Sequence, residues 1–208
     1  MARTNSNTKL ARKAGTTAVS LALGALFIGG SMSAAAAPFA FDMAVAAAAA
    51  ACLPHAQGHV TIRHVGNNNQ RMQVRVNGLP PNTEFAFFVL QTPTGPFGMS
   101  WYQGDIVTDD TGSGSQQFFG IFSSELFVFA PATRNAPQTD PFDALTNPVT
   151  APVHTYHLGL WFSNTTDASN AGCPATPTPF EGNHQAGIQV LNTSNFGTEA
   201  ADGPLGQF

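Results

Sequence analysis

Hydrophobic and polar residues alternate along much of the chain after residue 59, with the period of two that is typical of β-strands. In residues 70–77, Met72, Val74 and Val76 fall on one side of the alternation and polar or charged residues on the other, as in a half-buried strand. Residues 59–65 repeat the pattern, and an asparagine-rich turn separates the two segments. The pair therefore predicts a β-hairpin.

Further strands follow along the chain. Residues 84–91 are apolar on both sides of the alternation, which predicts a central strand covered on both faces. The other predicted strands are residues 99–107, 115–122, 125–130, 154–162 and 185–191. Residues 131–152 form a predicted loop, no helix is expected after residue 52, and the tail from residue 192 is expected to be partly mobile. Short strands without intervening helices predict an all-β fold, an antiparallel β-sandwich of about seven to nine strands.

The start of the chain has a different composition. A cationic segment with two lysines and two arginines precedes an uncharged apolar stretch and a run of small residues. This order is that of a secretory signal peptide, and we expect cleavage after Ala35 or Ala36. The predicted organisation is a signal peptide over 1–36, an alanine-rich lead-in over 37–52, helical or without regular structure, and a single β-sandwich domain over 53–208.

Two resemblances extend this prediction. The segment Leu79-Pro-Pro-Asn-Thr-Glu-Phe85 resembles the corner before the sixth strand of fibronectin type III domains, with Phe85 where those domains place a tyrosine. It implies an immunoglobulin-like sandwich and no particular activity. The whole chain, including Trp101-Tyr-Gln-Gly-Asp105 and residues 154–162, resembles uncharacterised small secreted proteins of high-GC Gram-positive bacteria. That resemblance implies export and no catalytic activity.

Removal of a signal peptide changes the charge balance. Both lysines and two of the arginines precede residue 37, whereas all 12 acidic residues follow it, so the mature chain has four arginines and a net charge of −8 instead of −4. A lysine-free acidic protein lacks the cationic surface that phosphate groups require, so nucleic acid is not expected as a partner. No apolar stretch reaches the roughly 20 residues of a spanning helix, so no integral membrane segment is expected in the mature chain.

Cys52 and Cys173 are the two cysteines of the chain, and both follow the predicted signal peptide. Two cysteines in an exported protein most often pair, so a structural disulfide is expected. The alternative is lipidation of Cys52, because Ala49-Ala50-Ala51-Cys52 loosely resembles a lipoprotein processing site. The alanine at the third position before the cysteine and the distance from the apolar stretch argue against that alternative.

Six histidines make metal binding worth considering, and His154 and His157 are the clearest pair. Metal-binding histidines on a strand favour a spacing of two, which places both imidazoles on one face. The spacing of three in this pair predicts opposite faces, so the pair is a weak candidate for a metal site. Asp109 and Asp110 are adjacent rather than alternating as in a calcium loop, which favours a hairpin turn.

Catalytic patterns are not evident in the sequence. It contains no Gly-x-Ser-x-Gly elbow, no paired cysteine and histidine and no cofactor-binding loop. We therefore expect a protein without a cofactor, and enzymatic activity is the less favoured interpretation. A secreted metal-binding protein or hydrolase that uses the histidines is the rival interpretation.

Aromatic residues supply the remaining candidate site. Phe97, Trp101, Tyr102, Phe118 and Phe119 cluster around one predicted hairpin. If several of them face outward, they form a platform for sugars or a patch for a protein partner; otherwise they fill the core. The sequence thus predicts a secreted, non-catalytic protein with a binding or structural role at the cell envelope or in the medium, with a cell-wall glycan or an envelope protein as the partner.

Overall fold

The computed structural model describes residues 37–66, 69–128 and 153–208. The signal peptide predicted over 1–36 and the loop predicted over 131–152 lie outside these residues. The elements of the described residues are β1 (Phe39–Val45), β2 (Gln57–Val65), β3 (Asn69–Asn77), β4 (Glu84–Leu90), β5 (Ser100–Val107), β6 (Gly114–Gly120), β7 (Phe127–Val128), β8 (Val153–His154), β9 (His157–Phe162), α2 (Thr165–Asn170), β10 (Gln189–Asn192) and two 3-10 helices, η1 (Ser194–Phe196) and η2 (Pro204–Gln207).

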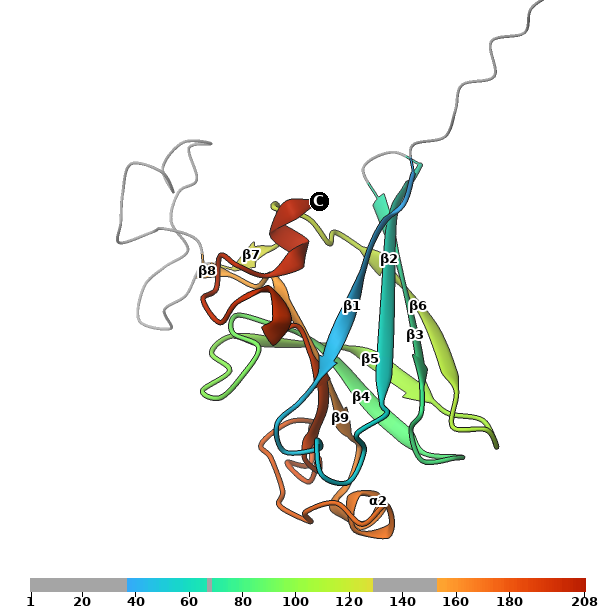
Figure 1. The fold of residues 1–208 in the computed structure, drawn as a ribbon. Coiled ribbons are helices and arrows are strands. Elements are labelled where there is room, and N and C mark those ends of the chain that lie inside the picture. The colour runs from blue at the N-terminus through green and yellow to red at the C-terminus, as the bar shows by residue number, and fades with distance from the viewer. Residues whose placement is uncertain (1–36, 67–68, 129–152) are drawn as a thin grey trace, which may run out of the picture. The chain divides into compact units, whose positions relative to one another are not determined.

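Eight of the strands form one antiparallel sheet in the order β5-β4-β9-β10-β1-β2-β3-β6 (Figure 1). Strand β1 joins the two halves of the sheet, because Phe39–Met43 pair with β2 whereas Ala44 and Val45 pair with β10. Strands β7 and β8 form a separate two-stranded ladder. The end strands β5 and β6 are consecutive in the chain and meet at one bridge between Thr108 and Gly114. The sheet is therefore nearly closed and barrel-like.

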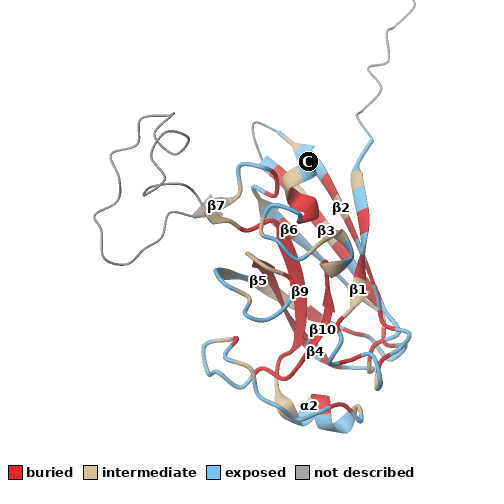
Figure 2. Cartoon of the chain, turned by 60° about the vertical axis from the view of Figure 1, so that its left-hand side comes forward, coloured by how far each residue is buried: buried red, intermediate tan, exposed pale blue. Residues whose placement is uncertain are grey.

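The core follows from the two-residue alternation. Met72, Val74 and Val76 on β3 are buried, as the pattern predicted. Strands β4, β9 and β10 are buried along almost their whole length (Figure 2), because the interior of the sheet covers one face of β4 and β9 and a second cluster covers the other. In that second cluster the Phe180 ring stacks on Trp161 at 4.3 Å between ring centroids.

The prediction of an all-β, antiparallel fold is confirmed. A sandwich of two separate sheets is not confirmed, because hydrogen bonds continue through β1 from one half of the sheet to the other. The immunoglobulin-like topology rests on the resemblance alone.

Three local predictions differ from the structure. The lead-in predicted over 37–52 contains β1, so the sheet begins at Phe39. A short helix, α2, follows Asn164, whose side-chain oxygen accepts a hydrogen bond from the Asp167 backbone N–H at 2.8 Å, which is a standard helix cap. The tail is held in place: Leu205 is buried, and the Phe208 ring contacts Phe39 at a centroid distance of 5.6 Å.

Candidate functional site

The end strands β5 and β6 lie next to each other but share one backbone bridge, and we call the opening between them the seam. The sequence predicted these strands as a hairpin, but the backbone of β5 pairs with β4 and that of β6 pairs with β3. The loop between them closes on itself, because the Asp109 carboxylate accepts hydrogen bonds from the backbone N–H groups of Thr111 and Ser113. The hydrogen bond that the Thr111 hydroxyl donates to the same carboxylate, together with these backbone bonds, lowers the pKa of Asp109. The role of this residue is therefore to hold the turn and not to form a calcium loop.

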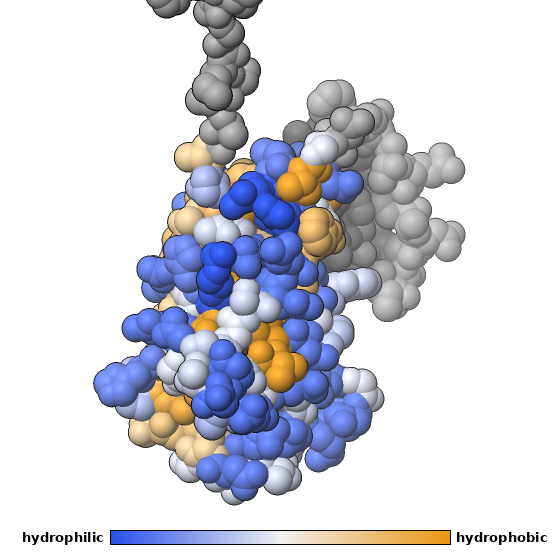
Figure 3. Space-filling model, turned by 90° about the vertical axis from the view of Figure 1, so that its right-hand side faces the viewer, coloured by the Kyte–Doolittle hydropathy of each residue, from blue (hydrophilic) through white to orange (hydrophobic). Residues whose placement is uncertain are grey.

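Four of the five aromatic candidates of the sequence divide between the surface and the core, and the fifth, Phe97, is partly buried against the second cluster. Trp101, Tyr102 and Phe119 are exposed, with 64%, 47% and 67% of their surface accessible, whereas Phe118 is buried. The ring of Phe118 stacks on Phe87 at 5.2 Å and closes the interior of the sheet. Figure 3 shows the side of the molecule on which β6 lies in Figure 1, a mostly hydrophilic surface with separate hydrophobic areas.

The seam opens into an apolar pocket of about 330 Å³, here called the seam pocket. Its lining consists of Val89, Met99, Ser100, Trp101, Gln103, Gly120, Ile121, Phe122, Leu126 and Thr155. None of these side chains is titratable. The volume lies within the range of small-molecule sites, which are typically apolar with a few polar groups.

Trp101 faces the seam pocket because of its position in the β4–β5 pairing. It lies opposite Val89, which belongs to the interior of the sheet. Tyr102 lies opposite Phe88, which belongs to the second cluster on the outside of the sheet, here called the outer cluster. The pairing shifts register between Phe87 and Phe88, which marks a bulge in β5. Because the sheet is open at the seam, the Trp101 side chain faces inward and is still accessible to solvent.

Sequence reasoning did not single out Met99, Ile121 or Leu126. Met99 directly precedes β5, and Ile121 and Leu126 follow β6, and an isolated apolar residue near a strand end is as typical of a core as of a binding site. The structure leaves Met99 and Ile121 exposed on the seam pocket.

The histidine pair predicted as a weak metal candidate is divided between two strands. His154 is on β8 and stacks on Tyr156 at 4.6 Å, while His157 is on β9 and is fully buried. Both ring nitrogens of His157 have partners at 2.9 Å, the Thr193 hydroxyl and the Glu199 carbonyl oxygen. Burial lowers the pKa of His157. Across the described residues, no group of three or more histidine, cysteine or acidic side chains is placed to hold a metal ion.

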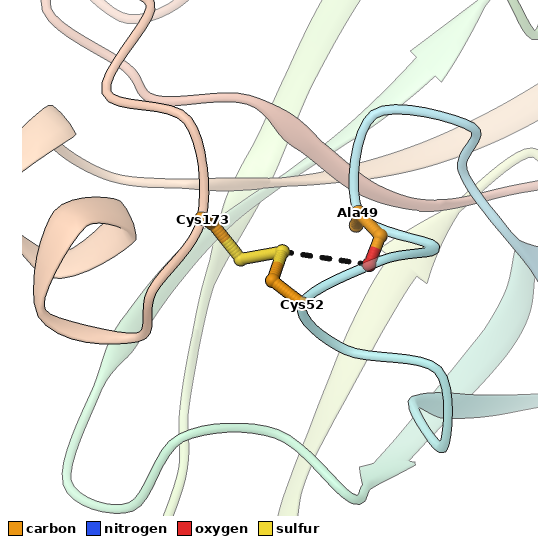
Figure 4. The surroundings of a disulfide bond; sticks show 3 residues. All are labelled: Ala49, Cys52 and Cys173. Atoms are coloured by element: carbon orange, nitrogen blue, oxygen red, sulfur yellow. Dashed lines mark hydrogen bonds between the residues drawn. A yellow bond between two sulfur atoms is a disulfide. The ribbon is translucent and has the colours of Figure 1, made fainter.

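The predicted disulfide is confirmed. Cys52, in the turn after β1, is bonded to Cys173, which follows α2, at an S–S distance of 2.01 Å (Figure 4). Cys52 Sγ also lies 3.4 Å from the Ala49 carbonyl oxygen. The bond closes a segment of 121 residues and is typical of proteins in an oxidising compartment.

Within the described part of the chain, no helix has the length and hydrophobicity needed to cross a membrane. Comparison with protein-family models finds no match, and comparison with curated proteins finds no similar sequence.

Proposed function

We propose that this chain is an exported, non-catalytic binding protein, and that the seam pocket is its site for an uncharged, apolar group. The main support for this proposal is Trp101, whose large aromatic side chain lines an apolar pocket and is still 64% accessible. Burying such a side chain against a ligand contributes about 2–3 kcal/mol. The exposed Met99 and Ile121 add further apolar surface to the same pocket.

Binding rather than catalysis is proposed because of the lining. The polar members, Ser100, Gln103 and Thr155, are uncharged at physiological pH and supply hydrogen bonds but no strong acid or base. A glycan would place many hydroxyl groups against an apolar wall, where unpaired polar groups cost free energy. An apolar ligand fits the lining better than the cell-wall glycan that the exposed aromatics first indicated.

Export is supported by two independent observations. The first 36 residues have the order of charge, apolar stretch and small residues found in secretory signal peptides. The Cys52–Cys173 disulfide suits an extracytoplasmic compartment. The same bond weighs against lipidation of Cys52, because an acyl anchor would need the sulfur atom that bonds to Cys173.

The test uses N-phenyl-1-naphthylamine, an uncharged apolar fluorophore, with the mature protein. We expect saturable binding that Trp101→Ala weakens at least about tenfold, since one central aromatic contact is worth more than 1.4 kcal/mol. Phe119→Ala is the matched control, because it also removes an exposed aromatic side chain from an end strand of the sheet and should leave the affinity unchanged.

Two results would contradict the proposal. Equal affinities for the parent protein and Trp101→Ala would exclude the seam pocket as the site of the fluorophore. Displacement of the fluorophore by N-acetylglucosamine oligomers, with the same dependence on Trp101, would make a glycan the ligand instead of an apolar group.

A further inference from the structure

The outer face of β2 and β3 carries a row of arginines. Arg63 on β2 lies directly opposite Arg71 on β3, and Arg75 follows on the same side of β3. Met72 and Val74 alternate with these residues and are buried in the core, so the arginine side chains point outward. Arg63 and Arg75 are exposed and Arg71 is half-buried. We call this surface the arginine face, and Figure 3 shows the hydrophilic side of the molecule on which the neighbouring β6 lies.

The arginine face concentrates the positive charge of the chain. It holds three of the four arginines that follow the predicted signal peptide, in a mature chain without lysine and with an expected net charge of −8. Side chains directly opposite each other on two antiparallel strands have Cβ atoms about 5 Å apart, and like charges in such positions are destabilising. The placement of Arg63 opposite Arg71 therefore costs free energy of folding, which indicates a role other than stability.

The arginine face has no ion pair with a described carboxylate. The one ion pair found among the described residues joins Asp42 and His59, at 2.6 Å. Arg75 and Asp109 line the same open hollow, but the Asp109 carboxylate accepts hydrogen bonds from backbone N–H groups of its own turn. Within the described structure, the positive charge of this face is therefore open to an anionic partner.

The spacing along β3 indicates the shape of that partner. Arg71 and Arg75 are four residues apart, which is about 13 Å along a strand. Gln73 lies midway between them, and its side-chain amide donates to the Ser115 hydroxyl on β6 at 3.0 Å. An extended peptide has the same rise per residue as β3. Two carboxylates four residues apart in such a peptide therefore match the positions of the two arginines.

We propose that the arginine face binds an extended acidic segment of a partner protein, with two carboxylates four residues apart held by Arg71 and Arg75. Arg63 adds a second guanidinium group beside Arg71. A guanidinium group binds a carboxylate through two parallel hydrogen bonds, which makes the contact specific. A phosphate polymer fits less well, because its dense negative charge would be repelled by the excess negative charge of the rest of the chain. The arginine face shares no residue with the seam pocket, so the proposal is independent of the ligand in that pocket.

The test uses the mature protein and a synthetic peptide, Thr-Glu-Thr-Ser-Thr-Glu-Thr, blocked at both ends. In protein with ¹⁵N-labelled arginine, the peptide should shift the side-chain Nε–H signals of Arg71 and Arg75 to saturation. Raising the salt concentration to about 0.3 M should weaken binding, because charges at an exposed surface are screened. A peptide with glutamine in place of both glutamates should shift neither signal. A peptide with its glutamates three residues apart places the carboxylates on opposite sides of an extended chain and should bind more weakly.

Substitutions check the residues. Arg71→Gln and Arg75→Gln should each weaken binding of the acidic peptide about threefold to fivefold, the range expected for one exposed ion pair. Thr166→Glu makes the same change in net charge at an exposed position of α2 and should leave the affinity unchanged. Arg71→Gln also removes the repulsion from Arg63, so this variant should unfold in urea at a midpoint no lower than that of the parent protein.

Several results would overturn the proposal. They are an absence of arginine shifts with the acidic peptide, equal binding of the glutamine peptide or of the peptide with the altered spacing, and a loss of affinity in Thr166→Glu as large as that in Arg71→Gln. Salt-sensitive association of the protein with itself in sedimentation experiments, abolished by Arg71→Gln, would make a second copy of the chain the occupant and would overturn it as well.

Discussion

Trp101 and Tyr102 are consecutive residues of β5 that line two different pockets on opposite faces of the sheet. Trp101 lies opposite Val89 and faces the seam pocket, whereas Tyr102 lies opposite Phe88 and faces a second pocket, which Glu84, Asp105 and Glu181 also line. One strand end thus lines an apolar pocket and a pocket that carries three carboxylates. Ser100 borders both pockets, so the two sites are neighbours across the edge of β5.

Phe118 and Phe119 should respond in opposite ways to substitution by alanine. Phe118 is buried and stacks on Phe87, so Phe118→Ala should lower the free energy of unfolding by about 3–5 kcal/mol. Phe119 is exposed, so Phe119→Ala should cost less than about 1 kcal/mol. Urea unfolding of both variants measures the difference. An equal decrease in the free energy of unfolding for both variants would contradict the placement of Phe118 in the core and Phe119 at the surface.

The alternation of residues predicted much of the sheet but not its closure. The alternation around Met72 and Val74, and the apolar residues on both faces near Phe87, predicted which side chains point into the core. The structure confirms these predictions. Strand β1 was missed because its alternating residues, Phe39 and Phe41 among them, stand directly before an alanine-rich run and after the predicted signal peptide. Its place between β2 and β10 depends on contacts with residues about 150 positions away, which no local pattern contains.

The candidate sites were harder to predict than the strands. The sequence indicated Trp101 and Tyr102 together, but the faces to which they belong depend on the bulge in β5 and on the open seam. It gave no indication that Glu181 lies beside Glu84 and Asp105, because the segment carrying Glu181 has no periodic pattern. Its position follows from the packing of Phe180 against Trp161 and from the bridge between Thr178 and Ala186.

The Cys52–Cys173 bond should contribute strongly to stability. Closing a segment of 121 residues restricts the unfolded chain, which on the chain-entropy model is worth about 4–5 kcal/mol. The double variant Cys52→Ser/Cys173→Ser should lose up to that amount in urea unfolding. Mass measurement of the parent protein before and after reduction supplies the control, since the bond appears as a gain of two hydrogens. An unchanged unfolding midpoint in the double variant would contradict the expectation.

His157 should make the protein less stable in mild acid. Burial lowers its pKa below the ordinary value of 6.5, although the Glu199 carbonyl group and the charge of Asp202 act in the other direction. As pH falls through 6.5, the unfolded chain therefore takes up a proton before the folded chain does, and stability decreases until the lower folded pKa is passed. The contribution is fully present above pH 6.5.

Thermal unfolding between pH 8 and pH 5 measures this effect. His157→Gln should flatten the decrease, because glutamine does not titrate in this range. His55 is exposed, and His55→Gln should leave the slope as it is in the parent protein. A slope that is the same in the His157→Gln variant and in the parent protein would assign the pH dependence to another group.

Cleavage of the predicted signal peptide should leave the sheet intact. We expect the mature protein to begin at Ala36 or Ala37, and β1 begins at Phe39, so every strand of the described sheet is retained. The mass and N-terminal sequence of protein recovered from the medium or the envelope measure the cleavage site. Recovery of full-length chain from the cytoplasm would contradict export.

The most direct measurement of the central claim uses the two tryptophans of the chain. Trp101 lines the seam pocket, and Trp161 is fully buried in the outer cluster, so each should give a separate indole N–H signal in ¹⁵N-labelled mature protein. The account predicts that N-phenyl-1-naphthylamine shifts the Trp101 signal progressively to saturation and leaves the Trp161 signal in place. Saturable binding of the fluorophore without movement of the Trp101 signal would contradict it.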